Sequence, residues 1–350
     1  MNALNTALNK SGRIVACLAV LMVTFLPQPV IARPPARILL LETMPVPVVL
    51  AHSKWFTEEL SRLGYEQGKN LDLVILKANG DKSRAERLLQ ENMARRPPDL
   101  VVTNATMASQ AAVKILQNTG IPILFMTVSD PVGAGLIEKI GTATGTNVTG
   151  RVHMISRQSR INMVMRLVGG LKREKPIRIG FIHSSYPSAM GDIRGLAAEA
   201  RDRSDMVFVP FQVEYRRVPA GVPAMLEAVS KGIDVLDAQI EAWWEPSGPL
   251  GELSEYTQLI VEKSKKPIVM GTKMRSVQLG ALLHLTPSIE GSGREVARLA
   301  DAILKGADPG KIPPAPPAAF DLGINLKTAL EMGIVVPPDI LKLAGENVFK

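Results

Sequence analysis

The chain has few of the residues that make covalent cross-links or aromatic cores. Its 350 residues include one cysteine, Cys17, and only 4% are aromatic. If the first 32 residues are a leader that is removed, the rest of the chain has no cysteine, which excludes a disulfide bond and a thiol nucleophile. With so few aromatic side chains, the core has to be mainly aliphatic.

The motifs of common enzyme classes are also missing. The histidines are scattered at His52, His153, His183 and His284, and no pair has the H-x-x-H or H-E-x-x-H spacing of a metal site. Neither a G-x-S-x-G elbow nor a Walker P-loop is present. We therefore expect a protein that is not an enzyme and that has no metal and no cofactor.

What the chain does contain is typical of a globular protein. Apolar residues make up 46% and charged residues 21%, and the length suggests about two domains. The formal charge is +8, but the basic clusters at 172–173 and 263–266 are not interleaved with aromatic residues, as a groove for single-stranded nucleic acid would be. We interpret the basic excess as solvated surface and expect no nucleic-acid partner.

Residues 1–32 have the pattern of a secretory signal peptide. Basic residues within 10–13 precede an apolar run over 14–26, and 30–32 offers a cleavage site. The run is shorter than the ~20 apolar residues that cross a bilayer, and no later segment reaches that length. Cys17 resembles a lipoprotein cleavage site, but most of the apolar run lies after it, so cleavage there would leave almost no apolar segment before the cut. We expect a soluble protein exported to the periplasm or another extracytoplasmic space.

Apolar runs that suit buried strands alternate with segments that suit helices. The expected strands cover 37–41, 71–76, 100–103 and 121–128, and after Gly150 the pattern restarts with 177–182, 207–213, 235–240 and 267–270. Strand–helix units in succession predict parallel sheets. The sequence therefore predicts an α/β chain with two doubly wound parallel-sheet lobes.

The expected strand over 121–128 runs into a turn, Ser129-Asp130-Pro131, followed by Gly133 and Gly135. The proline holds Asp130 in extended geometry, so that its carboxylate stands clear of the strand. Open α/β sheets bind ligands at the carboxyl ends of their strands, which favours a binding role for Asp130. A structural turn with a solvated aspartate explains the same residues equally well.

This turn carries a family resemblance. Residues 129–136 and 145–150 resemble the T/S-D-P-V-G-A-G-L and G-G-N-V-T-G turns of the tryptophan/tyrosine-type substrate-binding proteins of ABC importers. Further similar stretches lie at 64–70, 98–102, 280–281 and 324–333, so the resemblance covers about 36–343. It implies a type I periplasmic-binding fold, in which a three-crossing hinge joins the two lobes.

The resemblance also implies how the chain divides between the lobes. We expect a signal peptide over 1–32, an N-terminal lobe over 36–147 plus 277–311, and a C-terminal lobe over 148–276 plus 312–350. The crossings would lie near 145–151, 273–280 and 312–322, the last within a proline-rich strap.

In the first lobe, loops that follow strands would face the ligand. We expect contacts from Asn104, Thr106, Ser129 and Asp130. Thr106 begins a helix, where free backbone N–H groups can hold a carboxylate. The family usually has G-T-P-A-A here, whereas this chain has Ala-Thr-Met-Ala-Ser at 105–109, so the hydroxyl is kept while the glycine and the proline are not. An ordinary helix N-cap would explain Thr106 on local grounds.

In the second lobe, we expect Ser184, Tyr186, Glu241, Trp243 and Thr272 to complete the site. Glu241 stands where the family often has T-D-N, and its carboxylate could pair with a ligand ammonium group. Trp243 or its neighbour Trp244 could stack on a planar ligand or pack in the core. Lys273 and Arg275 replace acidic residues of the family, which weakens a transfer of its amino-acid ligands.

We therefore expect a monomeric solute-binding component of an ABC importer. It would trap an amino acid or a related polar or heterocyclic solute between its lobes and present it to the ABC permease. Two alternatives remain open. Asp130 and Glu241 could be the paired carboxylates of an exported hydrolase, or the chain could be a ligand sensor that docks on a membrane receptor.

Overall fold

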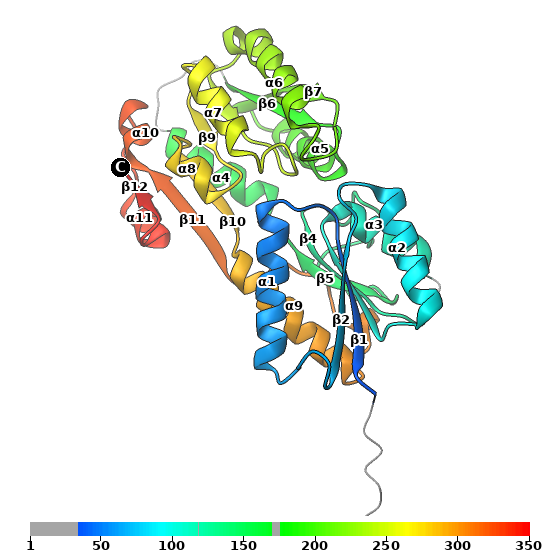
Figure 1. Ribbon diagram of the computed structural model, residues 1–350. Coiled ribbons are helices and arrows are strands. Elements are labelled where there is room, and N and C mark those ends of the chain that lie inside the picture. Colours follow the sequence, from blue (N-terminus) through cyan, green and yellow to red (C-terminus); the bar gives the residue numbers. More distant parts are fainter. Residues whose placement is uncertain (1–33, 118, 170–175) are drawn as a thin grey trace, which may run out of the picture. The chain divides into compact units, whose positions relative to one another are not determined.

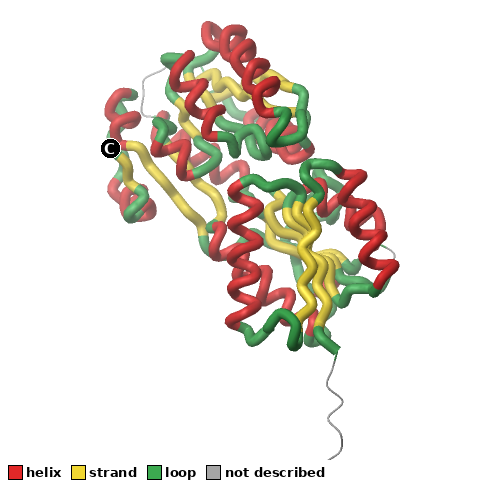
Figure 2. Tube along the Cα trace, viewed as in Figure 1, coloured by secondary structure: helices red, strands yellow, loops and turns green. Residues whose placement is uncertain are grey.

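The computed structural model describes residues 34–117, 119–169 and 176–350 (Figures 1 and 2). The expected signal peptide, 1–32, lies outside the described residues. Residues 35–350 form one unit, in which two sheets are each covered by helices. None of the helices in the described ranges is long and apolar enough to cross a membrane.

The first lobe is built on a five-stranded parallel sheet with the strand order β2-β1-β3-β4-β5. Its strands are β1 (Ala36–Glu42), β2 (Leu71–Lys77), β3 (Leu100–Asn104), β4 (Ile123–Val128) and β5 (Val148–Val152). Successive residues of β1 point to opposite faces, since Ile38 and Leu40 belong to one apolar cluster and Leu39 and Leu41 to another. This explains the continuous apolar run, because a strand covered on both faces needs apolar residues on both.

Two pairs of helices cover this sheet. The helices are α1 (Pro47–Arg62), α2 (Lys82–Arg95), α3 (Thr106–Leu116) and α9 (Ile289–Leu304). The apolar side chains of α1 and α9 share the cluster of Ile38, and those of α2 and α3 share the cluster of Leu39. Gly293 lets α9 lie close to α1, because a Cβ there would come within 2.7 Å of the Trp55 Cβ and 3.0 Å of the His52 carbonyl oxygen.

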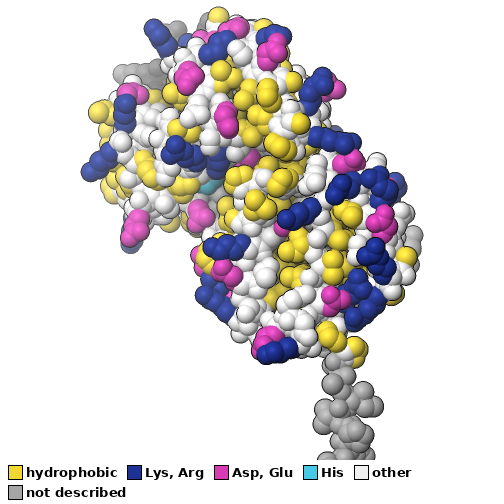
Figure 3. All heavy atoms as spheres, viewed as in Figure 1, with side chains coloured by type: hydrophobic (Ala, Val, Ile, Leu, Met, Phe, Trp, Pro, Cys, Tyr) yellow, Lys and Arg dark blue, Asp and Glu magenta, His cyan; other side chains and the backbone are white. Residues whose placement is uncertain are grey.

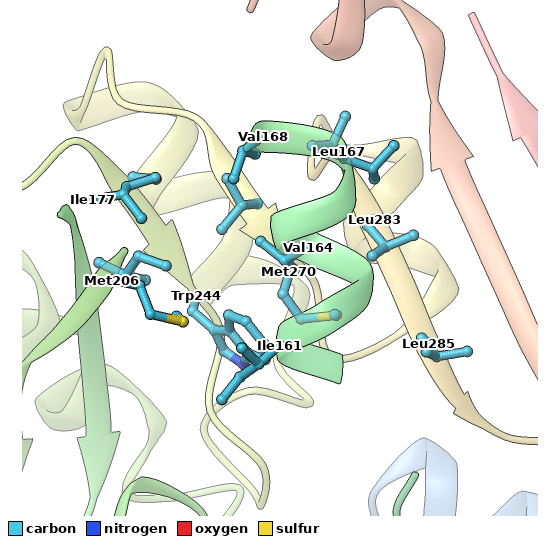
Figure 4. Close-up of a cluster of buried hydrophobic side chains, with 14 of the residues drawn as sticks. Ile161, Val164, Leu167, Val168, Ile177, Met206, Trp244, Met270, Leu283 and Leu285 are labelled. Atoms are coloured by element: carbon cyan, nitrogen blue, oxygen red, sulfur yellow. The ribbon is translucent and has the colours of Figure 1, made fainter. Parts of the chain in front are cut away.

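The second lobe is built on a four-stranded parallel sheet with the order β7-β6-β8-β9. Its strands are β6 (Ile177–Ser184), β7 (Met206–Val213), β8 (Ala242–Trp244) and β9 (Ile268–Met270), and its helices are α4 (Arg157–Val168), α5 (Pro187–Arg201), α6 (Val222–Leu236) and α7 (Ser254–Lys263). Figure 4 shows α4 laying Ile161 and Val164 beside Trp244 and Met270 in the core of this lobe. The prediction of two parallel-sheet lobes is confirmed.

One strand of the second lobe was wrongly predicted. The stretch 235–240 was expected to be a strand, but α6 continues to Leu236 and a 3-10 turn follows over Asp237–Gln239. The apolar residues Val229, Ile233 and Leu236 recur at helical spacing and are buried, whereas Val235 is exposed. The strand is β8, which begins only at residue 242.

A third, smaller sheet lies at the junction. Its strands are β10 (Leu283–Pro287), β11 (Phe320–Asn325) and β12 (Val348–Phe349), and short helices flank it: α8 (Met274–Gln278), α10 (Leu326–Glu331) and α11 (Pro338–Ala344). β10 and β11 run antiparallel, and their apolar residues join the core of the second lobe. Figure 1 shows this pair beside the second lobe and α9 beside α1 of the first.

These contacts bear on the division of the chain. Residues 277–311 were expected in the first lobe, yet β10 packs with the second, while α9 and the 3-10 turn Pro309–Lys311 pack with the first. Residues 312–350 were expected in the second lobe, yet the first of them contact the first lobe. Ile312 packs in its core, and the Val152 N–H donates to the Ala315 carbonyl at 2.9 Å. We propose that the chain crosses between lobes near 153–156, at Ser288 and over 316–319.

Charged side chains cover the surface with both signs. Figure 3 shows lysines, arginines and acidic residues interspersed over the face in view. Many of them form exposed ion pairs, as between Arg166 and Asp339 or Lys231 and Glu227. The basic excess is therefore spread and partly paired on the surface that the structure describes.

Candidate functional site

A cavity opens between the carboxyl ends of the first sheet and the second lobe. The empty space in it is about 420 Å³, including space open to solvent. The first lobe contributes Met44, Val46, Val48, Val49, Ala105, Thr106, Thr127 and Ser129; the second contributes Tyr186, Ser188, Gly248, Pro249 and Glu252; and His153 lies in the connection. An adjoining cavity of about 490 Å³ shares Ser129, His153, Gly248 and Glu252. We treat the two as one cleft.

The first-lobe wall combines a helix N-terminus with an apolar patch. Thr106 begins α3 after Ala105, whose φ of 77° is in the left-handed region. The Ala108 N–H already donates to the Thr43 hydroxyl at 3.0 Å. The Thr106 N–H therefore remains as a donor of the first turn beside a hydroxyl that lines the cavity. This end of the cleft suits an anionic group.

Three polar atoms of the cleft have no hydrogen-bond partner among the residues that the structure describes. They are the Thr127 Oγ1, the His153 Nδ1 and the Tyr186 hydroxyl. The Tyr186 hydroxyl lies near Thr43 and the Met107 backbone but outside hydrogen-bond geometry. Thr127 is also strained, because a β-branched residue rarely adopts its φ of 57°. Buried polar groups are normally paired, so these atoms point to a ligand that pairs them.

Glu252 supplies a carboxylate on the opposite wall. It lines both cavities. Burial raises the pKa of the Glu252 carboxyl to about 7, with nearby Lys273 lowering it and Glu245 raising it. Lys273 itself donates to the Gly251 carbonyl at 2.8 Å, and burial lowers its pKa. A ligand ammonium group beside this half-buried carboxylate would favour its ionised form and pair with it.

Glu245 holds the second-lobe loops in place. One of its oxygens accepts from the Thr257 hydroxyl at 2.6 Å, and the other accepts from the Thr272 N–H at 2.8 Å and the Ser276 hydroxyl at 2.6 Å. Its lone pairs are thus used within the protein, although it lines the adjoining cavity. Its role is to fix the loops that carry Glu252 and Thr272.

A group of histidines lies near the cleft. The rings of His52 and His153 meet edge to face with centroids 4.6 Å apart. Burial lowers the pKa of His52 and of His284 to about 4, and that of His153 well below its usual value. All three are therefore neutral at pH 7. Among the residues that the structure describes, no cluster of histidine, cysteine or acidic side chains could hold a metal ion.

The structure brings together four of the nine expected ligand contacts. Thr106, Ser129 and Tyr186 line the cavity, and Thr272 lines the adjoining one. The other five, Asn104, Asp130, Ser184, Glu241 and Trp243, line neither.

Three of these five are internal to a lobe. Asn104 is buried and donates to the Val49 carbonyl at 2.8 Å and the Ser53 hydroxyl at 2.9 Å, which ties α1 to β3. Ser184 is buried at the end of β6. Trp243 is fully buried, and its indole N–H donates to the Ser264 hydroxyl at 2.8 Å. Trp244 is also buried, so neither tryptophan faces the cleft.

The remaining two expected contacts are the acids. Glu241 precedes β8 and therefore lies at its amino end, exposed, where its carboxylate accepts from the Arg178 N–H. It was placed in the cleft because the strand before it was wrongly predicted. Asp130 lies at the rim and forms an ion pair with Arg157 at 3.2 Å. The two acids do not share a site, so they cannot be the paired carboxylates of a hydrolase.

Sequence reasoning missed Glu252, Thr127, His153 and the apolar wall. Glu252 follows Ser247-Gly248-Pro249, a loop signal that marks the true carboxyl end of β8. Thr127 lies within an apolar strand and has no sequence signal of its own. Only its left-handed backbone conformation marks it as unusual. His153 lines the cavity because it lies where the chain passes from the first lobe to the second. No local sequence pattern marks that position.

Comparisons with known proteins support the two-lobed fold. The family model described as ABC transporter substrate binding protein matches residues 38–348. A tyrosine-binding protein of Clostridioides difficile (strain R20291) is 25% identical over 297 residues, 84% of this chain and 78% of that protein. An ABC domain from Streptococcus pneumonia in complex with L-Trp superposes with a TM-score of 0.74 at 23% identity, over 90% of this chain and 100% of that chain. A conserved domain protein from Vibrio cholerae superposes with a TM-score of 0.71 at 23% identity, over 90% of this chain and 99% of that chain.

Proposed function

The chain belongs to the ABC transporter substrate-binding protein family, and from this premise we propose that it binds an amino-acid-like zwitterion in the cleft and presents it to an ABC permease. Solute binding is the role of the family. The kind of solute is argued from the cleft of this chain.

The observation that carries the proposal is the placement of opposite polarities at two walls of one cavity. The N-terminus of α3, with Thr106, offers donors for a carboxylate, and Glu252 offers an acceptor for an ammonium group. Between them, Val46, Val49 and Pro249 form an apolar wall. A molecule with both charges and an apolar side chain matches all three surfaces. The tyrosine-binding relative and the neighbour in complex with L-Trp support this class of ligand.

In this proposal the protein acts by binding alone. A ligand that bridges both walls stabilises the closed arrangement of the lobes, and closure is what the permease recognises. The expected signal peptide would bring the chain to an extracytoplasmic space, where it would act as a monomer and without nucleic acid.

The test is a set of matched ligands that differ by one charge. L-Tryptophan, tryptamine and indole-3-propionate have the same ring, but the second lacks the carboxylate and the third lacks the ammonium group. We expect L-tryptophan or L-tyrosine to raise the melting temperature, since a ligand at 100 times its dissociation constant adds about 2.7 kcal/mol to the stability. Each single-charge analogue should bind at least roughly tenfold more weakly, because it leaves a charged or polar group of the cleft unpaired.

Two results would count against the proposal. One is stabilisation by neutral sugars with no response to any amino acid. The other is conversion of the bound molecule over time, measured by mass spectrometry of the recovered ligand, which would indicate an enzyme.

A further inference from the structure

We propose that Asp130 and Arg157 form a closure pair that sets the affinity for the solute without contacting it. This inference rests on the proposed function, in which the two lobes close on a ligand. Asp130 lies in the turn after β4 of the first lobe, and Arg157 is the first residue of α4 in the second. The Arg157 Nη2 lies 3.2 Å from the Asp130 Oδ2, and the two side chains are only 23% and 15% exposed.

Each partner is held in place by its own lobe. The Asp130 Oδ1 accepts from the Gly133 N–H at 3.0 Å, which leaves Oδ2 for the arginine. The Arg157 Nη2 also donates to the Gly191 carbonyl at 3.1 Å on α5. Because both groups are oriented by local contacts, their meeting costs less side-chain entropy than a free surface ion pair.

Two glycines on one face of α5 form the socket for this pair. Gly191 and Gly195 are one helical turn apart. A Cβ at Gly191 would lie 2.5 Å from the Asp130 Oδ2, and the nearest atoms around it all belong to Asp130. A Cβ at Gly195 would overlap the Arg157 guanidinium. The two glycines therefore leave room for the pair, and a side chain at either position would have to displace Asp130 or Arg157.

A second ion pair also joins the lobes, but it contributes less. Arg217 approaches Asp81 at 2.9 Å, yet its side chain is 65% exposed. Exposed pairs of this kind contribute little to stability because water and salt screen them. The Asp130–Arg157 pair is the better shielded of the two.

The pair acts through the equilibrium between open and closed lobes. Asp130 lines neither cavity, so its loss leaves the ligand contacts unchanged. If the closed form is a minor state of the empty protein, the apparent dissociation constant is inversely proportional to its population. A variant that lowers the closed-to-open ratio of the empty protein by a given factor should then raise the dissociation constant by the same factor.

The experiment measures both quantities in Asp130→Asn, Arg157→Gln and the double variant. Spin labels at Glu91→Cys on α2 and Lys231→Cys on α6, with Cys17→Ser, report the distance between the lobes by double electron–electron resonance. We expect each single variant to lower the closed-to-open ratio of the empty protein by roughly tenfold and to weaken L-tryptophan binding by the same factor. The double variant should bind L-tryptophan no more weakly than either single variant, because both substitutions remove the same interaction.

Gly191→Ala probes the socket without changing any charge. Alanine favours a helix over glycine, and the atoms nearest to the added Cβ belong to Asp130 of the other lobe. We expect this variant to keep or raise the melting temperature of the empty protein while it shifts the lobes open and weakens binding. Arg166→Gln is the matched control on α4, because Arg166 pairs with Asp339 within the second lobe, and it should leave the lobe distance unchanged.

Two outcomes separate this inference from its alternatives. If Asp130→Asn weakens binding while Arg157→Gln and the lobe distances stay as in the parent, Asp130 contacts the ligand and the closure pair is refuted. If the variants shift the lobe distances but L-tryptophan does not bind even the parent protein, the closure pair stands and the proposed ligand fails.

Discussion

Lowering the pH from 8 to 6 should weaken the binding of an amino acid about tenfold through the protonation of Glu252. The carboxylate must be ionised to pair with an ammonium group, and burial raises its pKa to about 7 in the empty cleft. With that pKa, roughly nine tenths of the protein carries the charge at pH 8 and roughly one tenth at pH 6. The ammonium and carboxylate groups of the ligand keep their charges over this range.

The histidines near Glu252 do not titrate between these pH values. Burial lowers the pKa of His52 and of His284 to about 4 and that of His153 well below its usual value, so all three stay neutral. Burial lowers the pKa of Lys273 from its ordinary value of 10.5, while nearby acids including Glu245 act to raise that pKa. A midpoint near pH 7 would therefore report Glu252 itself.

The assay is isothermal titration calorimetry with L-tryptophan at pH values from 6 to 8, in the parent and in Glu252→Gln. Glutamine cannot ionise, so its binding should be weak and independent of pH. Glu241→Gln is the matched control, because Glu241 is an exposed acid outside the cleft, and it should keep the profile of the parent. A flat profile in the parent, or a profile that persists in Glu252→Gln, would refute the assignment of the ammonium site.

The raised pKa of Glu252 also predicts how the stability of the empty protein changes with pH. The folded pKa of Glu252 is raised above the ordinary value of 4.5, so its contribution to stability is present below pH 4.5 and is lost as the pH rises through about 7. The difference of roughly 2.5 pKa units corresponds to at most about 3 kcal/mol. Glu252→Gln removes this penalty, so the empty variant should be more stable than the parent above pH 7 in urea unfolding, and the difference should vanish toward pH 4.5.

Three further substitutions separate the cleft from the lobe cores. Glu241→Ala should leave the dissociation constant for L-tryptophan unchanged in calorimetry, and a tenfold loss would restore Glu241 to the site. Trp243→Ala should lower the free energy of unfolding by about 3–5 kcal/mol in urea, since it empties a fully buried site; a variant as stable as the parent would contradict this packing. Thr106→Val should weaken binding about tenfold by removing a hydroxyl from the carboxylate end while the melting temperature stays within a few degrees, and unchanged binding would move the carboxylate away from α3.

Much of the fold could be predicted because its strands are buried on both faces. Such strands are continuous apolar runs, and the runs at 37–41 and 100–103 leave no other good interpretation. β8 could not be found in this way because it has only three residues and follows a helix whose last turn is equally apolar. The lobe boundaries also have no local signal, since β10 and α9 are adjacent in sequence but pack in separate cores.

The candidate site was predictable only where a local rule applies. Thr106 and Ser129 follow strands of the first sheet, and the rule that ligands bind at the carboxyl ends of strands found both. The same rule applied to a wrongly placed strand selected Glu241 instead of the acids after Trp244. Glu252 carries no motif, and its raised pKa arises from burial by segments distant in sequence, which a reading of local patterns does not provide.

Asp130 shows why a turn that resembles a family motif does not by itself define a ligand contact. The proline after it directs its carboxylate away from the strand, as the sequence predicts, but the direction is toward α5 of the other lobe, where Gly191 leaves room for it. A residue in that position influences affinity as strongly as a ligand contact if closure is coupled to binding. A loss of affinity in an Asp130 variant therefore cannot distinguish the two roles, whereas a parallel loss in Arg157→Gln can, because Arg157 also lines neither cavity.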